Sequence, residues 1–260
     1  MTDFLVNFLI VGTQKGGTTA LAKFLAQHPD ICFAPCKEVH FFDGVEYDRT
    51  QNQAQLNQLY QQSFPNWQGQ QIVGEATPIY MYLPFVAERI YHYNPQMKLI
   101  FLLRDPVERA ISHYNMELGR GLEWLSLPAA IALEPYRLWK DRHNLHEKSS
   151  LRCHSYSDRG FYAQQIIRMQ QYFPREQMLF LKTEDLWQHH RGILQDIYDF
   201  LGLANGKFMP DQELVFHQEK TLKLNYISNL LLRYYLKQRF KRANILLAKT
   251  LGWNNLEWNK

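Results

Sequence analysis

The chain has 260 residues, of which 46% are apolar, 21% charged and 14% aromatic. This composition is that of an ordinary globular protein and excludes a collagen-like, low-complexity or globally disordered chain. The net charge of +4 hides an asymmetry, because residues 220–260 hold nine Lys and Arg and one acid (+8), which leaves −4 for residues 1–219. A basic end favours a phosphate-bearing or otherwise anionic partner, with a solvated helix face as the alternative.

Apolar runs alternate with helical periodicity along the chain. Strands are predicted at 4–11, 71–75, 98–103 and 178–181, and helices at 18–27, 84–93, 160–173, 184–201 and 228–251. Strands that are apolar on both faces and alternate with helices favour a parallel sheet that is covered on both sides. We therefore predict an α/β protein with a P-loop-like three-layer fold, in which helices flank a central parallel sheet. A single domain over residues 1–260 is expected, with a less regular region around 119–158.

The number of cysteines and the lengths of the apolar runs indicate the cellular compartment in which the protein is located. Cys32, Cys36 and Cys153 are too few for a disulfide scaffold. Two thiols in a CxxxC spacing without nearby partners do not predict a zinc site, so no metal is expected. The apolar run at 4–11 lacks a preceding basic region, and no run approaches 18 apolar residues, so neither a signal peptide nor a transmembrane segment is expected. A reducing cytoplasm is the predicted location.

The first predicted strand runs directly into a glycine-rich loop and then a helix. The loop consists of Gly12, Thr13, Gln14, Lys15, Gly16, Gly17, Thr18 and Thr19. A strand, a glycine-rich loop and a helix in this order wrap phosphate with backbone N–H groups. In the nucleoside-triphosphatase loop a lysine follows the second glycine, whereas here Thr18 takes that place and the lysine lies three residues earlier. The pattern predicts phosphate binding and argues against the usual ATPase or GTPase; a plain glycine-rich turn is the alternative.

A second cluster follows the third predicted strand. Asp105, Pro106 and Glu108 are helix-start residues: an N-cap, a first helical residue and the closing member of a capping box. Ser112 lies two helical turns after Asp105, so it shares the cap's face and can converge with Arg104 at the carboxyl end of the strand. An arginine fork and a hydroxyl at that edge predict a phosphate site.

With these two clusters placed, the chain resembles sulfotransferases that use the donor PAPS (3′-phosphoadenosine 5′-phosphosulfate), most of all the branch of heparan sulfate and related carbohydrate sulfotransferases. The resemblance implies that residues 13–19 bind the 5′-phosphosulfate and that Arg104 and Ser112 bind the 3′-phosphate. Three further segments match in family order, at 37–43, 75–80 and 183–186 followed by 200–203, so that the likeness spans about residues 5–203.

The segment 37–43 carries the expected chemistry. If it is extended, Glu38 and His40 project to one face and Asp43 to the other. A sulfuryl acceptor must lose a proton as it attacks, and a positioned carboxylate can take it. The resemblance implies that Glu38 is the general base, that His40 supports it and that Lys15 stabilises charge on the leaving phosphate. An exposed acidic edge with a satisfied histidine is the alternative.

The implied reaction moves a sulfuryl group from PAPS to an acceptor hydroxyl or amine on a glycan, a lipid or a small molecule, leaves PAP and needs no metal. Two departures from the family pattern stand out. Ala76 takes the place of a lysine found in relatives that sulfate glucosamine, so we expect poor activity on heparan-type acceptors. The late lysine–glycine loop that covers the nucleotide is not cleanly present, and Lys220 and Lys223 are the candidates for its role.

Two other functional classes compete with this interpretation. A P-loop nucleotide kinase is disfavoured by Thr18 in the lysine position and by the lack of a convincing metal-holding aspartate. A non-catalytic nucleotide- or nucleic-acid-binding module would use the basic C-terminus, but Glu38 beside the donor motifs speaks against it, so nucleic acid is not the expected partner. The basic helix carries Arg233, Lys237 and Lys241 on one face. A solvated face is the preferred interpretation, and peripheral contact with a membrane or an acidic acceptor is the alternative.

Overall fold

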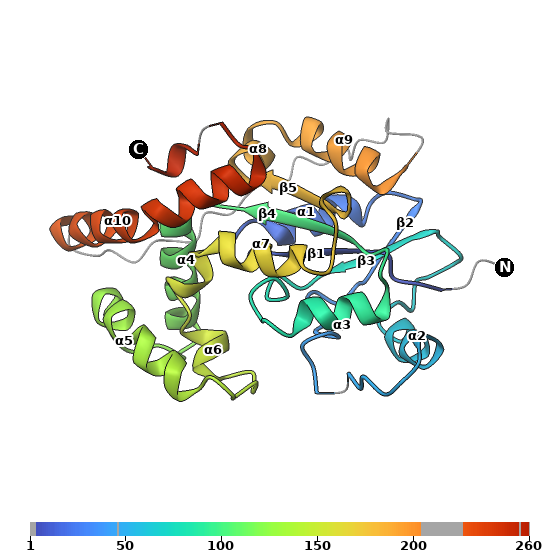
Figure 1. The fold of residues 1–260 in the computed structure, drawn as a ribbon, viewed down its shortest axis with the longest axis horizontal. Coiled ribbons are helices and arrows are strands. Elements are labelled where there is room, and N and C mark those ends of the chain that lie inside the picture. Colours follow the sequence, from blue (N-terminus) through green and yellow to red (C-terminus); the bar gives the residue numbers. More distant parts are fainter. Residues whose placement is uncertain (1–3, 46, 204–225, 255, 260) are drawn as a thin grey trace. The chain divides into compact units, whose positions relative to one another are not determined.

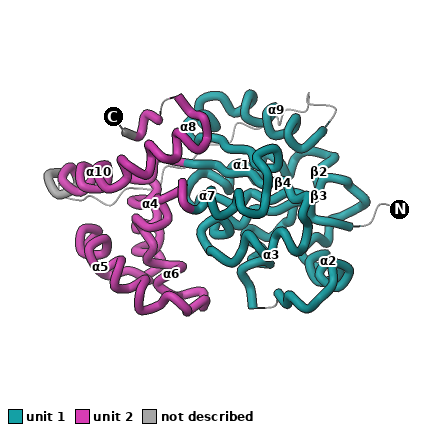
Figure 2. Tube along the Cα trace, viewed as in Figure 1, with its two compact units in different colours: residues 1–103, 165–216 teal, residues 104–164, 217–260 magenta. Residues whose placement is uncertain are grey.

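The structure is a computed structural model that describes residues 4–45, 47–203, 226–254 and 256–259. It divides into two compact units (Figure 2): unit 1 comprises residues 1–103 and 165–216, and unit 2 comprises residues 104–164 and 217–260. The single domain expected from the sequence stays a prediction. Lys220 and Lys223 lie outside the described residues.

Unit 1 is built on a five-stranded parallel sheet with the strand order β2-β3-β1-β4-β5 (Figure 1). The strands are β1 (Phe8–Gly12), β2 (Ile31–Phe33), β3 (Ile72–Ala76), β4 (Lys98–Leu103) and β5 (Met178–Lys182). All of β1 is buried, as is β4 after its first residue, which is the pattern of strands covered on both faces. The predicted parallel α/β fold is confirmed. The three residues of β2 were missed because so short a strand has no measurable period.

Helices cover both faces of this sheet. One face packs on α1 (Thr18–Leu25), α8 (Thr183–Gln188) and α9 (His190–Leu201), which share one apolar core with the sheet. Figure 1 places α3 (Val86–Tyr93) on the opposite face from α1, and α2 (Gln53–Gln61) beside α3. The 3₁₀ turn η2 (Arg175–Gln177) precedes β5. The helix predicted at 184–201 is in fact two, since the backbone leaves the helical region at His189.

Unit 2 is helical. It contains α4 (Pro106–Gly119), α5 (Leu127–Lys140), α6 (Ser150–Cys153), the turns η1 (Asp158–Gly160) and η3 (Glu257–Asn259), and α10 (Tyr226–Leu251); α7 (Tyr162–Gln170) begins in unit 2 and ends in unit 1. Side chains from α4, α5 and α10 form its apolar core. The less regular region predicted around 119–158 is irregular only outside α5 and the four-residue α6. The helix α5, of 14 residues, was missed because Pro128 and Pro135 hide its signal.

The start of α4 follows its sequence signals in part. The Asp105 carboxylate accepts from the N–H groups of Val107 and Glu108, at 2.7 and 3.2 Å, as an N-cap should. The predicted reciprocal role of Glu108 is not seen, since its carboxylate is paired with the guanidinium of Arg233 on α10. Among the described residues, no helix combines the length and the apolar character needed to cross a bilayer.

Candidate active site

The glycine-rich loop connects the carboxyl end of β1 to the first residue of α1. Its first N–H, that of Thr13, donates to the carbonyl of Leu102 in the neighbouring strand β4 (2.9 Å), and the N–H of Gly16 turns back to the carbonyl of Thr13 (2.9 Å). The Thr183 hydroxyl lies 2.6 Å from the carbonyl oxygen of Gly16. Lys15 and Gly17 have positive φ values of 69° and 91°. The loop is thus a tight turn fixed to the sheet on two sides.

The geometry of this loop suits an anion. In α1 the first turn has no acidic residue and Gly17 at the N-cap supplies no side-chain cap, so the helix's first N–H groups and its positive end are available to a bound group. A Cβ on Gly16 would lie 2.6 Å from the carbonyl oxygen of Leu102 and 2.8 Å from that of Thr13. Only glycine therefore fits at this point, which lets the backbone close tightly around a phosphate.

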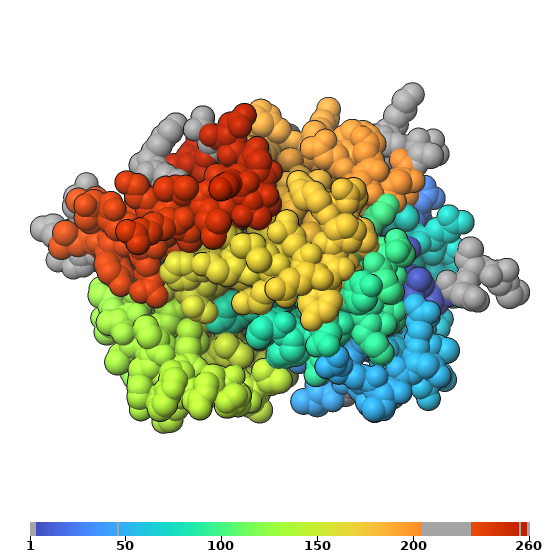
Figure 3. Space-filling model, viewed as in Figure 1, coloured from blue at the N-terminus to red at the C-terminus, as the bar shows by residue number. Residues whose placement is uncertain are grey.

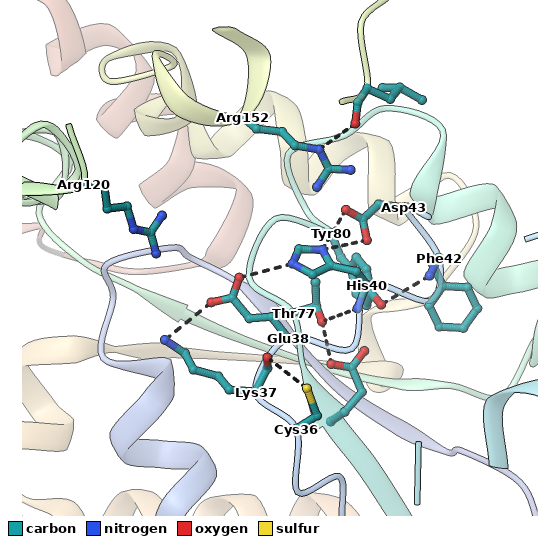
Figure 4. A network of polar contacts seen from close by, with 12 residues as sticks. Cys36, Lys37, Glu38, His40, Phe42, Asp43, Thr77, Tyr80, Arg120 and Arg152 are labelled. Atoms are coloured by element: carbon teal, nitrogen blue, oxygen red, sulfur yellow. Dashed lines mark hydrogen bonds and ion pairs between the residues drawn. The ribbon is translucent and has the colours of Figure 1, made fainter. Parts of the chain in front are cut away.

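The segment 37–43 is not extended, which corrects the sequence expectation. Glu38 and His40 have φ values of 61° and 58°, so the chain turns at both residues and folds Asp43 back toward His40. The Nδ1 atom of His40 lies 2.9 and 3.1 Å from the two carboxylate oxygens of Asp43, and its Nε2 atom lies 3.6 Å from Oε2 of Glu38 (Figure 4). One imidazole thus stands between two carboxylates.

These three side chains differ sharply in exposure. The Asp43 side chain is fully buried, whereas those of Glu38 and His40 are 24% and 41% exposed. Lys37 adds a cation on the outer side, with Nζ 3.5 Å from Oε1 of Glu38. A buried carboxylate that fixes one ring nitrogen orients the other toward the partly exposed glutamate, which is the arrangement of an oriented acid–base pair.

A buried polar network lies beneath this group. The N–H of His40 donates to Oγ1 of Thr77 (3.3 Å), and the Thr77 hydroxyl donates to the carboxylate of Glu75 (2.7 Å). The Tyr60 hydroxyl donates to the other oxygen of Glu75 (3.1 Å). Glu75 is fully buried, and burial raises its pKa to about 7, although hydrogen bonds from Thr77, Tyr80 and Tyr60 oppose the shift.

Further contacts hold the segment at its far end. The N–H of Phe42 donates to the Tyr80 hydroxyl (3.3 Å) and the Arg89 guanidinium donates to the carbonyl of Phe42 (2.9 Å). The ring of Phe41 stacks on that of Tyr60 with centroids 3.9 Å apart. Sequence reasoning missed Glu75, Thr77 and Tyr60 as parts of the site. A glutamate inside an otherwise apolar strand is the signal that could have revealed the first of these.

The glycine-rich loop follows β1, and Thr77, to which His40 is hydrogen-bonded, follows the neighbouring strand β3. Strand β1 pairs in parallel with β3, with Ile10 opposite Ala76, so the loop after Gly12 and the turn at Thr77 emerge at the same carboxyl edge. The N–H of Met81 donates to the carbonyl of Val11 (3.0 Å), which holds the second turn against β1. Open α/β sheets bind ligands at this edge.

The predicted 3′-phosphate residues belong to unit 2. Arg104 follows β4 directly, and its carbonyl accepts from the Tyr162 hydroxyl (2.9 Å). Ser112 lies in α4, two turns beyond the capping Asp105, and both Arg104 and Ser112 are partly buried. Their convergence on one phosphate stays a prediction.

In the described part of the chain, no group of three His, Cys, Asp or Glu side chains is placed so that it could hold a metal ion. Cys32 and Cys153 are buried and Cys36 is exposed, and all three are free thiols. Burial raises the pKa of both Cys32 and Cys153 to about 11, which makes them poor nucleophiles.

A five-stranded parallel sheet with flanking helices and a glycine-rich strand–loop–helix turn at its carboxyl edge is the architecture of a P-loop-like α/β fold. The family model of the sulfotransferase domain matches residues 6–242, and the chain belongs to this family. The family resemblance seen in the sequence is confirmed.

Individual relatives agree with this assignment. Heparan sulfate glucosamine 3-O-sulfotransferase 6 of Mus musculus is 34% identical over 212 residues, which cover 82% of this chain and 56% of the relative. Heparan sulfate glucosamine 3-O-sulfotransferase 3B1 of Homo sapiens is 34% identical over 83% of this chain and 50% of its own length. The chain thus spans about half the length of the curated relatives it matches.

Solved structures show the same fold. The crystal structure of a sulfotransferase from Alicyclobacillus acidocaldarius has a TM-score of 0.79 and 28% identity, covering 99% of this chain and all of that one. The sulfotransferase domain from the curacin biosynthetic pathway has a TM-score of 0.53 at 16% identity over 98% of this chain and 100% of that one, which supports the fold alone.

Proposed function

We propose that the protein transfers a sulfuryl group from PAPS to an acceptor hydroxyl or amine. Family membership supports the reaction class, and one observation carries the assignment of the site. Glu38 is linked through His40 to the buried Asp43, and this group sits at the same sheet edge as the glycine-rich loop. A base and an anion-binding loop at one edge are the two parts that sulfuryl transfer needs.

In this proposal, the glycine-rich loop and the N-terminus of α1 bind the sulfuryl donor. PAPS would supply the activated sulfuryl group, and the fit rests on the glycine cradle at Gly16 and on a helix N-terminus without acidic residues. Backbone N–H groups there and the Lys15 ammonium stabilise the negative charge that develops on the leaving phosphate.

In this proposal, Glu38 deprotonates the acceptor. The acceptor oxygen or nitrogen forms a bond to sulfur while the bond between sulfur and the phosphate oxygen breaks, and that oxygen keeps the bonding electrons in PAP. The acceptor's proton passes to the Glu38 carboxylate. Asp43 holds Nδ1 of His40 and thereby directs Nε2 toward Glu38, so His40 orients the base and interacts with its charge.

Radiolabelled PAPS tests the proposal directly. The purified protein is incubated with ³⁵S-labelled PAPS and a panel of hydroxyl and amine acceptors, including an extract of the source cell, and labelled products are identified. Transfer of label, with release of PAP, is expected. Absence of transfer together with magnesium-dependent phosphate transfer from ATP would overturn the proposal in favour of a kinase; tight, salt-sensitive RNA binding without transfer would favour a binding module.

The predicted 3′-phosphate site gives a binding test. Because Arg104 and Ser112 lie in the segment matched to that site, the protein should bind PAP far more tightly than AMP. Arg104→Ala removes charge-assisted hydrogen bonds worth about 1.5–3 kcal/mol each, so PAP should bind roughly 10- to 100-fold more weakly while AMP is unaffected. Calorimetry on the wild type, Arg104→Ala and the exposed-arginine control Arg142→Ala checks this. Equal affinity for PAP and AMP in the wild type would remove the assignment.

The tight packing around Gly16 leads to a second prediction about donor binding. In Gly16→Ala the new Cβ meets two backbone carbonyl oxygens, so the loop must shift, at a cost of about 1–3 kcal/mol of stability, and PAP binding should be lost. Gly192→Ala is the matched control, since a Cβ there meets nothing within 4 Å. Thermal unfolding and PAP calorimetry on both variants measure the effect. A Gly16→Ala protein that binds PAP normally would show that this loop does not close on the donor.

The acceptor is proposed to be a glycan, a lipid or a small molecule that is less acidic than a sulfated heparan chain. The relatives above act, by their names, on heparan sulfate glucosamine, but Ala76 replaces the lysine of such relatives and its side chain lies in the apolar core of unit 1. Initial rates with N-sulfated heparan oligosaccharides and with neutral glycans or alcohols should favour the latter. Comparable rates on heparan oligosaccharides and on neutral acceptors would show that a lysine at position 76 is not needed for activity on heparan-type acceptors.

A further inference from the structure

Helix α10 is apolar on opposite sides, which is unusual for a helix at a protein surface. One side is buried and consists of Leu232, Leu236, Phe240, Ala243, Leu247 and Leu251, the first three of which belong to the apolar core of unit 2. Between residues 230 and 251, the other large apolar side chains of the helix are 40% to 65% exposed: Leu230, Leu231, Tyr234, Tyr235, Ile245 and Leu246. In Figure 3 the atoms of α10 form a continuous strip of the surface in view. Clustered exposed apolar groups of this kind mark an interaction surface.

The charges on this helix have one sign. From residue 230 to 251 it carries Arg233, Lys237, Arg239, Lys241, Arg242 and Lys249 and no acidic residue. Arg233 pairs with Glu108 and so is engaged within unit 2, which corrects the basic face expected from the sequence. Lys237, Lys241, Arg242 and Lys249 are exposed.

Helical spacing puts basic and apolar groups on one outward face. The successive spacings of Leu231, Tyr234, Lys241, Ile245 and Lys249 are three, seven, four and four residues, which places all five on the side away from the buried row. Arg242 and Tyr235 flank this line. The outward face of α10 is defined here as the exposed residues between 230 and 249.

We infer that the outward face of α10 docks on the surface of an anionic phospholipid membrane. Lysine and arginine side chains reach lipid phosphates while their stems and the tyrosine rings remain at the boundary between headgroups and acyl chains. Leucine and isoleucine side chains insert just below that boundary. Anionic lipids therefore satisfy both kinds of side chain on this face at once.

A second copy of the chain and a nucleic acid both fit the outward face of α10 less well than an anionic membrane does. A second copy that packed its α10 against this one would bring cations against cations, with no acidic residue of the helix between residues 230 and 251 to pair them. Nucleic acid would take the cations but leave the leucine and isoleucine side chains against phosphate and water. Of these three occupants, the lipid surface alone uses both the charge and the apolar area of this face.

Vesicle flotation tests the inference and needs no acceptor, so its result is independent of the proposed reaction. The full chain is mixed with vesicles of phosphatidylcholine alone, or of phosphatidylcholine with 30% phosphatidylserine. Binding to the anionic vesicles is expected to be at least tenfold tighter than to the neutral ones and to weaken on raising the salt concentration.

Two variants separate the two contributions. Leu231→Ser with Ile245→Ser removes apolar side chains without changing charge, and Lys241→Glu with Arg242→Glu reverses two cations; each should weaken binding to anionic vesicles at least fivefold. The matched controls, Ile167→Ser and Lys23→Glu, alter exposed residues of unit 1 and should bind like the wild type. Circular dichroism and thermal unfolding confirm that every variant is folded.

Several outcomes would overturn the inference. These are equal binding to neutral and anionic vesicles, loss of binding in the control variants to the same extent, or wild-type binding by both α10 variants. Sedimentation that shows a dimer broken by Leu231→Ser with Ile245→Ser, without vesicle binding, would assign this face to a second copy instead.

Discussion

Glu38→Gln is expected to lower the turnover number about 10²- to 10⁴-fold, the usual cost of losing a general base. The amide keeps the shape of the side chain and can still lie beside Nε2 of His40, but it cannot take a proton from the acceptor. PAP binding should survive, because the glycine-rich loop is a separate element, fixed by β4 and Thr183. The measurement is turnover at saturating PAPS with one identified acceptor, together with calorimetry for PAP.

The neighbouring residues supply the controls. His40→Ala and Asp43→Asn should each cost less than Glu38→Gln if the imidazole only orients the base. The contact between His40 and Glu38 also allows the reverse assignment, in which the imidazole accepts the proton and the glutamate orients it. Turnover within a few-fold of wild type in Glu38→Gln, with no turnover in His40→Ala, would identify the histidine as the base.

Local signals were enough to predict the frame of the molecule. The strand at 98–103 is a continuous apolar run with a polar boundary, and it has these same limits in the structure. The glycine-rich loop was found because it follows a buried strand and precedes a helix, and the cap at Asp105 depends only on adjacent residues. Each of these features is encoded within about ten residues.

The shape of the candidate site could not be predicted in this way. Asp43 was assigned to the wrong side because a strand period was applied to a segment with two positive φ values, for which neither Glu38 nor His40 carries a signal. The contact of His40 with Thr77 joins residues 37 positions apart. Such contacts depend on the pairing of strands, which no local pattern specifies.

The buried carboxyl of Glu75 is expected to make the free energy of unfolding depend strongly on pH. Burial raises the pKa of this group to about 7 from its ordinary value of 4.5. The groups that face it are the hydroxyls of Tyr60, Thr77 and Tyr80, which donate to it, and His40, whose charge would lower its pKa. Between pH 4.5 and about pH 7, the Glu75 carboxyl is protonated in the folded protein and ionised in the unfolded chain.

This difference fixes the sign of the pH dependence. Where the folded state binds more protons than the unfolded state, the free energy of unfolding falls as the pH rises. The fall starts near the ordinary pKa of a glutamate and is complete above pH 7, with a total of about 3 kcal/mol from this group. A carboxyl with a lowered pKa would give the opposite slope.

Glu75→Gln should remove this slope. The amide oxygen can still accept from Thr77 or Tyr60, but the side chain carries no titrating proton, so the variant should gain stability relative to wild type as the pH is raised from 5 to 8. Urea unfolding at several pH values measures the difference between the two proteins, which cancels the titration of other groups. Glu176→Gln, at an exposed glutamate, should leave the slope unchanged. If the wild type and Glu75→Gln change in parallel across this range, Glu75 is already ionised in the folded protein at pH 5, and its carboxylate must be stabilised by more than the three hydroxyls around it.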